Sequence, residues 1–177
     1  AALVAMVARL TVGKKKYAGV EARMWQIVEQ AEALRSDLTQ AVKDDAAAFE
    51  TYLSAVRLPK DTPEQQAARA QALEAATLVT IHSPLSTARK AVEVLRLAVE
   101  TARTGNVNAI SDAASGAALA RAALTGSGLN VRINCPNLQD QAAAQGFIDE
   151  INQLETQAQA LETELRQALS ERGKLAW

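Results

Sequence analysis

The sequence has a single cysteine and a single histidine, and each shortage excludes a class of protein. Cys135 has no second cysteine with which to form an internal disulfide, so we expect a reducing compartment. With His82 as the one histidine, zinc cages and nucleophile–histidine triads lack their residues, and we expect His82 to be a partly exposed helical residue. Carboxylate, amide and lysine side chains remain for chemistry.

Strong charge of one sign and long hydrophobic runs are also lacking. The net charge is −1 and the pI is near 5.9, so no overall positive field attracts nucleic acid or an anionic membrane. The apolar run within residues 1–12 is shorter than the ~20 residues of a membrane span, and no basic segment precedes it as in a signal peptide. We expect no nucleic-acid partner, no membrane partner and a cytoplasmic location. Because this run has no capping residue before it, we also expect residues upstream of Ala1.

Alanine is abundant, hydrophobic residues make up 49% of the chain, and apolar residues recur at helical spacing. Residues 17–56 predict one long helix, in which Asp45 fills the one gap of the apolar stripe. Thr62 and Pro63 have the residue types of an N-cap and a first helical position. The stripe positions are Ile27, Ala31, Leu34, Leu38, Val42, Phe49, Tyr52 and Val56.

The second half of the chain continues the helical pattern with four special features. Pro84 predicts a kink, or a break between two helices, in the segment that ends at Gly105. Small residues over 108–125 predict a central, crowded helix. Residues 129–134 alternate like a strand, but no second strand exists to pair with them, so we expect irregular or helical structure. The heptad seam over 147–168 needs a long partner helix, in the same chain or across a dimer.

We therefore predict one all-α domain over residues 1–177, an up-and-down bundle of long antiparallel helices. Asp45 is the sharpest functional signal, since a carboxylate in an apolar stripe is either paired or kept for function. A structural ion pair, with Arg132 or with Lys43 of another copy, is the alternative. Asp112 could equally serve the dipole of its own helix. The basic run 14–16 is either a solvated face or an anchor for a carboxylate-bearing ligand.

Several uncommon motifs, in this order along almost the whole chain, resemble the cyclodeaminase/cyclohydrolase family of folate enzymes. That family includes the C-terminal domain of formiminotransferase-cyclodeaminase and bacterial methenyltetrahydrofolate cyclohydrolases. Family members carry a Gly-Gly-Gly-Ser stretch that would lie before Ala1, and an apolar residue is more usual at Cys135. The motifs are Leu10-Thr11 with Lys14-Lys15-Lys16-Tyr17, Asp45-Ala46-Ala47-Ala48-Phe49, Arg57-Leu58-Pro59-Lys60, Thr62-Pro63-Glu64, Pro84-Leu85, Gly105-Asn106-Val107-Asn108, Ser111-Asp112-Ala113 and Leu129-Asn130-Val131-Arg132-Ile133-Asn134.

The resemblance implies a helical homodimer that acts on a one-carbon tetrahydrofolate at a cleft between subunits, without a metal or redox cofactor. Cyclohydrolase activity adds water to the methenyl carbon, whereas cyclodeaminase activity closes a formimino group and expels ammonia. Both pass through a tetrahedral carbon and need a proton acceptor and donor. Because no formiminotransferase domain is present, we favour the cyclohydrolase, with the cyclodeaminase as the alternative. A non-enzymatic helical dimerisation module is a further alternative.

The resemblance also implies roles for particular residues. Asp45 and Asp112 are the expected acid/base pair. Lysines of the basic run, with Arg57 or Lys60, are expected to attract the glutamate tail of the folate, and asparagines to hold the pterin edge or orient water. The expected substrate-binding residues are Lys14, Lys16, Arg57, Lys60, Asn106, Asn108, Ser111, Asn130 and Asn134.

Overall fold

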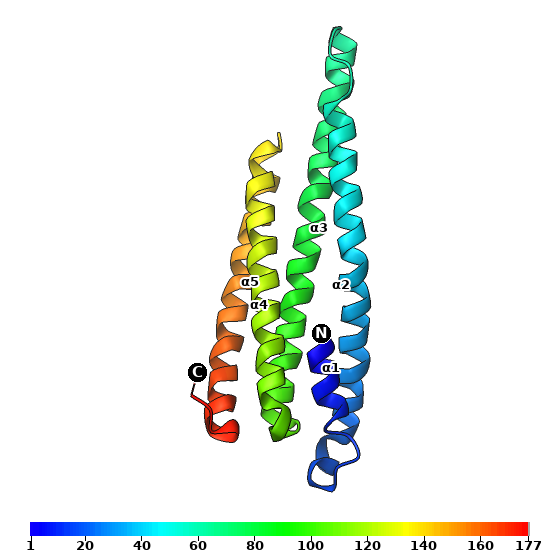
Figure 1. Ribbon diagram of the computed structural model, residues 1–177. Helices are drawn as coiled ribbons and strands as arrows, with labels where there is room; N and C mark the ends of the chain where they lie inside the picture. The colour runs from blue at the N-terminus through cyan, green and yellow to red at the C-terminus, as the bar shows by residue number, and fades with distance from the viewer. Residues whose placement is uncertain (177) are drawn as a thin grey trace.

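The computed structural model describes residues 1–176, which form α-helices joined by short turns (Figure 1). No strand occurs in this part of the chain, so the predicted all-α class is confirmed and 129–134 is helical. The helices are α1 (Ala2–Arg9), α2 (Glu21–Val56), α3 (Pro63–Thr104), α4 (Ile110–Asn134) and α5 (Gln141–Ala168), with the 3-10 turns η1 (Lys15–Val20), η2 (Val107–Ala109) and η3 (Cys135–Asn137) and the π turn η4 (Leu169–Gly173).

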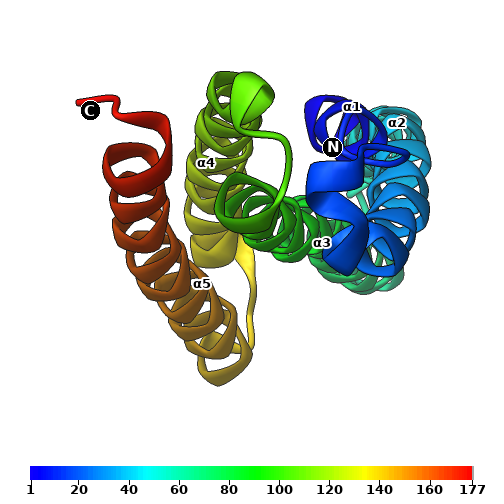
Figure 2. The ribbon, with the colours of Figure 1, turned by 90° about the horizontal axis from the view of Figure 1, so that it is seen from below.

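The four long helices α2, α3, α4 and α5 alternate in direction, as expected for an up-and-down bundle (Figure 1). The α2–α3 hairpin projects beyond the ends of α4 and α5. Seen from below, α3 lies in the middle, with α1 and α2 on one side and α4 and α5 on the other (Figure 2). The short α1 lies in the lower half of the bundle and packs against both α2 and α4. We call the end of the bundle that holds α1, η1 and η2 the lower end.

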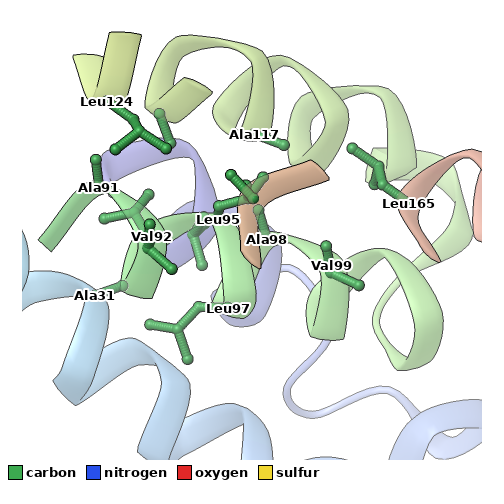
Figure 3. Close-up of a cluster of buried hydrophobic side chains, with 14 of the residues drawn as sticks. Ala31, Ala91, Val92, Leu95, Leu97, Ala98, Val99, Ala117, Leu124 and Leu165 are labelled. Atoms are coloured by element: carbon green, nitrogen blue, oxygen red, sulfur yellow. The ribbon is translucent and has the colours of Figure 1, made fainter. Parts of the chain in front are cut away.

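The hydrophobic core forms around α3, not around the helix with the small residues. Figure 3 shows Val92, Leu95 and Ala98 of α3 between side chains of α2 and α4. The prediction that 108–125 is the central helix is therefore wrong. Its small residues do permit a close approach, because a Cβ atom at Gly116 would lie 3.4 Å from the Cβ of Leu3 in α1. The other side of α4 faces solvent.

Helix boundaries follow local sequence chemistry. The Thr62 hydroxyl accepts from the Gln65 N–H at 3.3 Å, and the Gln65 side chain accepts from the Thr62 N–H, which completes a capping box. Thr62 and Pro63 therefore begin α3 as predicted. The helix then runs unbroken through Pro84, so the alternative of two separate helices is wrong.

The heptad seam of α5 is satisfied within the chain. Ile151, Ala158 and Leu165 are fully buried, and α5 packs against α3 and α4. Phe147 is partly buried and meets His82 edge-on, with ring centroids 5.1 Å apart, so the expectation of a partly exposed His82 in a helix is confirmed. The seam therefore gives no reason for a dimer.

Gly105, between α3 and η2, is required by space. A Cβ atom there would lie 2.7 Å from the Thr101 carbonyl oxygen and 3.1 Å from the Thr11 hydroxyl. We expect Gly105→Ala to lower the free energy of unfolding by about 1–3 kcal/mol, as for other overpacked sites. Urea denaturation followed by circular dichroism measures this change. Gly146→Ala in α5, where a Cβ meets nothing within 4 Å, is the matched control and should be neutral or stabilising.

Candidate functional site

A pocket of about 250 Å³ opens between α2, α3 and α4 in the upper half of the bundle. We call it the middle pocket. It brings together three side chains that the sequence predicted for the site, the Asp45 carboxylate and the Asn130 and Asn134 carboxamides. Its lining residues are Asp45, Phe49 and Tyr52 of α2, Thr80 and Pro84 of α3, and Asn130, Ile133 and Asn134 of α4.

Helical periodicity explains this convergence. Asp45, Phe49 and Tyr52 follow one another at steps of four and three, so they share one face of α2. Asn130 and Asn134 are four residues apart and share one face of α4. These faces of α2 and α4 thus meet across α3, which forms the floor of the pocket.

Pro84 changes the hydrogen bonding of that floor. Proline has no N–H, so the Thr80 carbonyl four residues earlier lacks its usual helical donor. The Asn134 side chain supplies a donor, because its Nδ2 lies 3.2 Å from the Thr80 oxygen. This bond links α4 to α3 at the pocket itself.

Asp45 is exposed in the single chain, so the expectation of a buried stripe is wrong at this position. Neither a hydrogen bond nor an ion pair holds its carboxylate within residues 1–176. Its suggested partner Arg132 binds Glu155 instead, at 2.8 Å, and this contact raises the guanidinium pKa. Asp45 thus stands free at the mouth of the pocket.

Large apolar side chains surround this mouth and face solvent. Val42 and Phe49 of α2 are 71% and 56% exposed, and Leu129 and Ile133 of α4 are 63% and 71% exposed. The upper part of the predicted α2 stripe therefore borders the pocket and does not enter the core. Exposed apolar side chains gathered at a pocket are typical of a surface that another molecule covers.

The middle pocket belongs to a longer groove between α2 and α4. Below it lies an apolar pocket of about 230 Å³, at the N-terminal end of α1. Leu38, Ala91 and Ala123 line this lower pocket. Each lies seven residues, or about 10 Å of helix, from a residue of the middle pocket, respectively Asp45, Pro84 and Asn130.

Above the middle pocket, toward the tip of the α2–α3 hairpin, lies a basic pocket of about 320 Å³. Lys60 and Arg69 line it, and Leu73 on its α3 side lies seven residues before Thr80. Its one acidic residue, Glu74, accepts from the Gln139 backbone N–H at 3.0 and 3.1 Å. This basic pocket, between α3 and the α4–α5 connection, therefore carries an excess of positive charge.

Only part of this basic pocket was predicted. Lys60 lines it, and its expected role in attracting the glutamate tail stays a prediction, whereas Arg57 is exposed at the end of α2 and does not line it. Arg69 was missed. Its position in α3, eleven residues before Thr80 and hence close to the same helical face, was the available signal.

At the lower end, Asn106 is buried in the turn between α3 and α4. Its Nδ2 donates to the Leu10 carbonyl at 3.1 Å, and its Oδ1 accepts from the Asn108 N–H at 3.2 Å. Its own N–H donates to the Thr11 hydroxyl at 2.8 Å. Because both ends of the carboxamide bind backbone, Asn106 stabilises the turn, and the structure does not place it in the groove.

The other predicted binding residues of the lower end are exposed. Lys14 and Lys16 lie in the connection before α2, with the Lys16 ammonium 5.5 Å from the centre of the Tyr17 ring. Asn108 is exposed in η2. Ser111 lines a separate pocket of about 310 Å³ between α4 and the C-terminal segment. Their substrate-binding roles stay predictions.

Asp112 lies in the first turn of α4 and is half-buried. Eighteen residues of α4, about 27 Å, separate it from Asn130 at the middle pocket. Within a single chain the two carboxylates are therefore too far apart to act on one carbon, and the acid/base pair stays a prediction for a site shared between subunits. Asp112 does share the helical face of Leu119, Ala123 and Asn130, since steps of seven and four residues connect them.

Residues 1–176 contain no cluster of three or more His, Cys, Asp or Glu side chains that could hold a metal ion. No helix in the same part of the chain combines the length and apolar character that a membrane span requires. Cys135 is buried, and burial raises the pKa of its thiol. None of these features adds a reactive group to the groove.

Comparison with known proteins supplies independent information. Residues 1–153 match the family model described as formiminotransferase-cyclodeaminase. The chain is 43% identical, over 91% of its length and 77% of the relative, to a methenyltetrahydrofolate cyclohydrolase of Methylorubrum extorquens. It is 34% identical to the formimidoyltransferase-cyclodeaminase of Sus scrofa over 80% of its own length, but spans 26% of that protein. The crystal structure of a formiminotetrahydrofolate cyclodeaminase from Thermotoga maritima superposes with a TM-score of 0.85, at 27% identity, over 96% of this chain and 80% of that one.

Proposed function

Because the chain belongs to the formiminotransferase-cyclodeaminase family, we propose that it is a methenyltetrahydrofolate cyclohydrolase. It hydrolyses 5,10-methenyltetrahydrofolate to 10-formyltetrahydrofolate. The middle pocket carries the proposal, since a free carboxylate there lies near two carboxamides on the opposite wall. A carboxylate supplies proton transfer, and carboxamides suit the donor and acceptor edge of a pterin.

The chemistry assigns Asp45 to proton transfer. As water attacks the methenyl carbon, the carboxylate accepts a proton from the water and a tetrahedral carbon forms. The carbon–N5 bond then breaks, its electron pair stays on N5, and the Asp45 carboxylic acid returns the proton to N5. The hydroxyl proton of the intermediate leaves to solvent as the formyl C=O forms. One water is consumed and one proton is released overall.

An absorbance assay tests this function directly. The purified chain should abolish the methenyltetrahydrofolate absorbance faster than buffer alone, and should release no ammonia from formiminotetrahydrofolate. Ammonia release would favour the cyclodeaminase, which the similar Thermotoga structure makes the second candidate. Turnover of neither substrate would leave only the non-enzymatic dimerisation module.

The exposed rim favours a homodimer in which a second copy covers the middle pocket. General-base catalysis by a carboxylate is most efficient when removal from water brings its pKa toward neutrality, and Asp45 is exposed in the single chain. A second copy on the rim would bury Val42, Phe49, Leu129 and Ile133 together. It would also remove solvent from the reacting carbon.

A two-fold axis perpendicular to α4 would also bring the two aspartates together. With the axis near residue 121, residue 112 of one copy lies level with residue 130 of the other. Exposed Ala122, Ala123 and Gly126 near that level let two α4 helices approach closely. The acid/base pair implied by the family resemblance would then join Asp45 of one copy to Asp112 of the other.

The basic pocket is the proposed anchor for the glutamate tail. We expect Lys60→Gln with Arg69→Gln to raise KM about tenfold with kcat little changed, since tail binding is equal in the ground and transition states. The rise should be larger for polyglutamylated folate and smaller in high salt. Steady-state kinetics with both substrate forms measures it. Arg35→Gln with Arg96→Gln removes the same charge at exposed residues outside the pocket and should leave KM unchanged.

The same assay tests the lysines that the sequence singled out. Lys14→Gln with Lys16→Gln removes two charges at the lower end of the bundle. An increase in KM for this variant alone, with none for the Lys60 and Arg69 variant, would move the tail site to the lower end. Unchanged KM in both variants would reject an electrostatic tail anchor at either position.

A further inference from the structure

The floor of the middle pocket contains a proline of α3 that affects the hydrogen bonding of a side chain on α4. Pro84 is buried in the interior of α3, where a proline is ordinarily unfavourable. It removes one N–H from the helix and leaves the Thr80 carbonyl four residues earlier without that donor. A carbonyl group without its helical donor commonly accepts a hydrogen bond from water instead.

Here a side chain of α4 takes the place of the missing donor. The Asn134 Nδ2 donates to the Thr80 oxygen at 3.2 Å, across a separation of 54 residues. Thr80, Pro84 and Asn134 all border the middle pocket. Because an amide group is planar, a carboxamide whose nitrogen is held at Thr80 has its Oδ1 turned away from that carbonyl.

The orientation of the other asparagine is not fixed in this way. Asn130 lies one turn earlier on the same face of α4 and is exposed. No hydrogen bond within residues 1–176 holds its side chain, and none reaches the Oδ1 of Asn134. The two carboxamides therefore differ: Asn130 is free to rotate, whereas Asn134 is anchored through its nitrogen.

We propose that Pro84 is a positioning residue, which frees the Thr80 carbonyl so that the Asn134 carboxamide is held with Oδ1 as a hydrogen-bond acceptor in the middle pocket. The site thereby selects a ligand edge that offers N–H donors. In the proposed substrate, the 2-amino group and the N3–H of the pterin form such an edge, so this inference rests on the proposed function. An unanchored amide would present either end and would lose this discrimination.

Kinetics of single and double variants test the coupling. Asn134→Ala removes the acceptor and should raise KM about tenfold, the equivalent of one hydrogen bond, with kcat changed much less. Pro84→Ala restores the helical N–H, releases the carboxamide and should raise KM several-fold while keeping or raising the melting temperature. In the Asn134→Ala background, Pro84→Ala should have no further effect on KM. Pro136→Ala, at an exposed proline outside the pocket, should change neither KM nor stability.

A spectroscopic measurement separates this inference from the proposed function, because it needs no substrate. In ¹⁵N-labelled protein the Asn134 side-chain amide protons should exchange slowly with solvent, and Pro84→Ala should speed that exchange toward the Asn130 reference. Additive effects on KM, or equal exchange in wild type and Pro84→Ala, would overturn the positioning role. A wild-type chain that shows the slow exchange but turns over no folate would retain the anchored amide and reject the folate function.

Discussion

Replacing Asp45 by asparagine is expected to lower kcat about 100-fold or more, with little change in KM or in the melting temperature. Asparagine has nearly the same size, so the rim of the middle pocket keeps its shape, but it cannot accept a proton from water. The Asp45 carboxylate is bound by no residue of the described chain, so its loss breaks no internal contact. Single-turnover absorbance measurements on methenyltetrahydrofolate would follow the chemical step directly.

Asp44 supplies the matched control for this variant. It is the adjacent residue, it is also exposed, and its carboxylate accepts from Gln40 at 2.9 Å on a different side of α2. Asp44→Asn makes the same change of charge outside the pocket and should retain wild-type turnover. If Asp45→Asn and Asp44→Asn both retained it, Asp45 would have no part in proton transfer.

Mixing two inactive variants is expected to restore activity. If each site joins Asp45 of one copy to Asp112 of the other, Asp112→Asn should also lose about 100-fold in kcat. Mixed dimers of Asp45→Asn and Asp112→Asn then contain one intact site and one site with both changes. Random exchange of subunits gives half mixed dimers, so about one quarter of the wild-type rate should return.

The distance along α4 makes this experiment a test of a site shared between two copies. Because about 27 Å separates the levels of Asp112 and the middle pocket within one chain, the two carboxylates cannot serve one reacting carbon without a second copy. Sedimentation equilibrium should show a dimer at micromolar concentration, and native mass spectrometry with one variant ¹⁵N-labelled should show that the subunits have exchanged. Exchange without recovered activity would exclude a site shared in this manner, and a monomer would exclude the dimer itself.

The positions of the long helices could be predicted from the sequence alone. Apolar residues at steps of three and four located the long helices, and the Thr62–Gln65 capping box begins α3 where the residue types predicted a start. These signals are local, because they depend on residues within one or two turns. Pro84 left two alternatives open, a kink or a break between two helices, and the structure shows one continuous helix.

What covers each helical face could not be read from periodicity. The α2 stripe is continuous in sequence, yet Ile27 and Ala31 enter the core whereas Val42 and Phe49 border the groove. The difference arises because α1 packs against the lower part of α2, and this contact between two helices is not contained in the spacing of residues along α2. Periodicity shows which residues share a face but not which helix lies against it.

The candidate site was predicted only in part, because the sequence does not show which helices lie against one another. Asp45, Asn130 and Asn134, which the family resemblance assigned to one site, meet in one pocket. Asn106 has the residue type of a ligand-binding amide, but its hydrogen bonds to Leu10 and Asn108 depend on the contact between α1 and the α3–α4 turn. The role of Thr80 and Pro84 depends on one interhelical hydrogen bond that no spacing reveals.

The hydrogen bonds at the lower end impose an order on folding. The turn after α3 is held from before by Thr11 and Tyr17, 95 and 90 residues earlier in sequence, and from after by Arg172, which donates to the carbonyls of Ala102 and Gly105. Contacts of such long sequence separation form late, since their loop-closure entropy must first be offset by other contacts. During synthesis the α2–α3 hairpin can therefore pair while the ribosome is still adding α5. The turn before α4 gains its two hydrogen bonds from Arg172 only after that residue has left the exit tunnel, so a ribosome stalled before it would hold a chain whose hairpin can form while the turn lacks these two bonds.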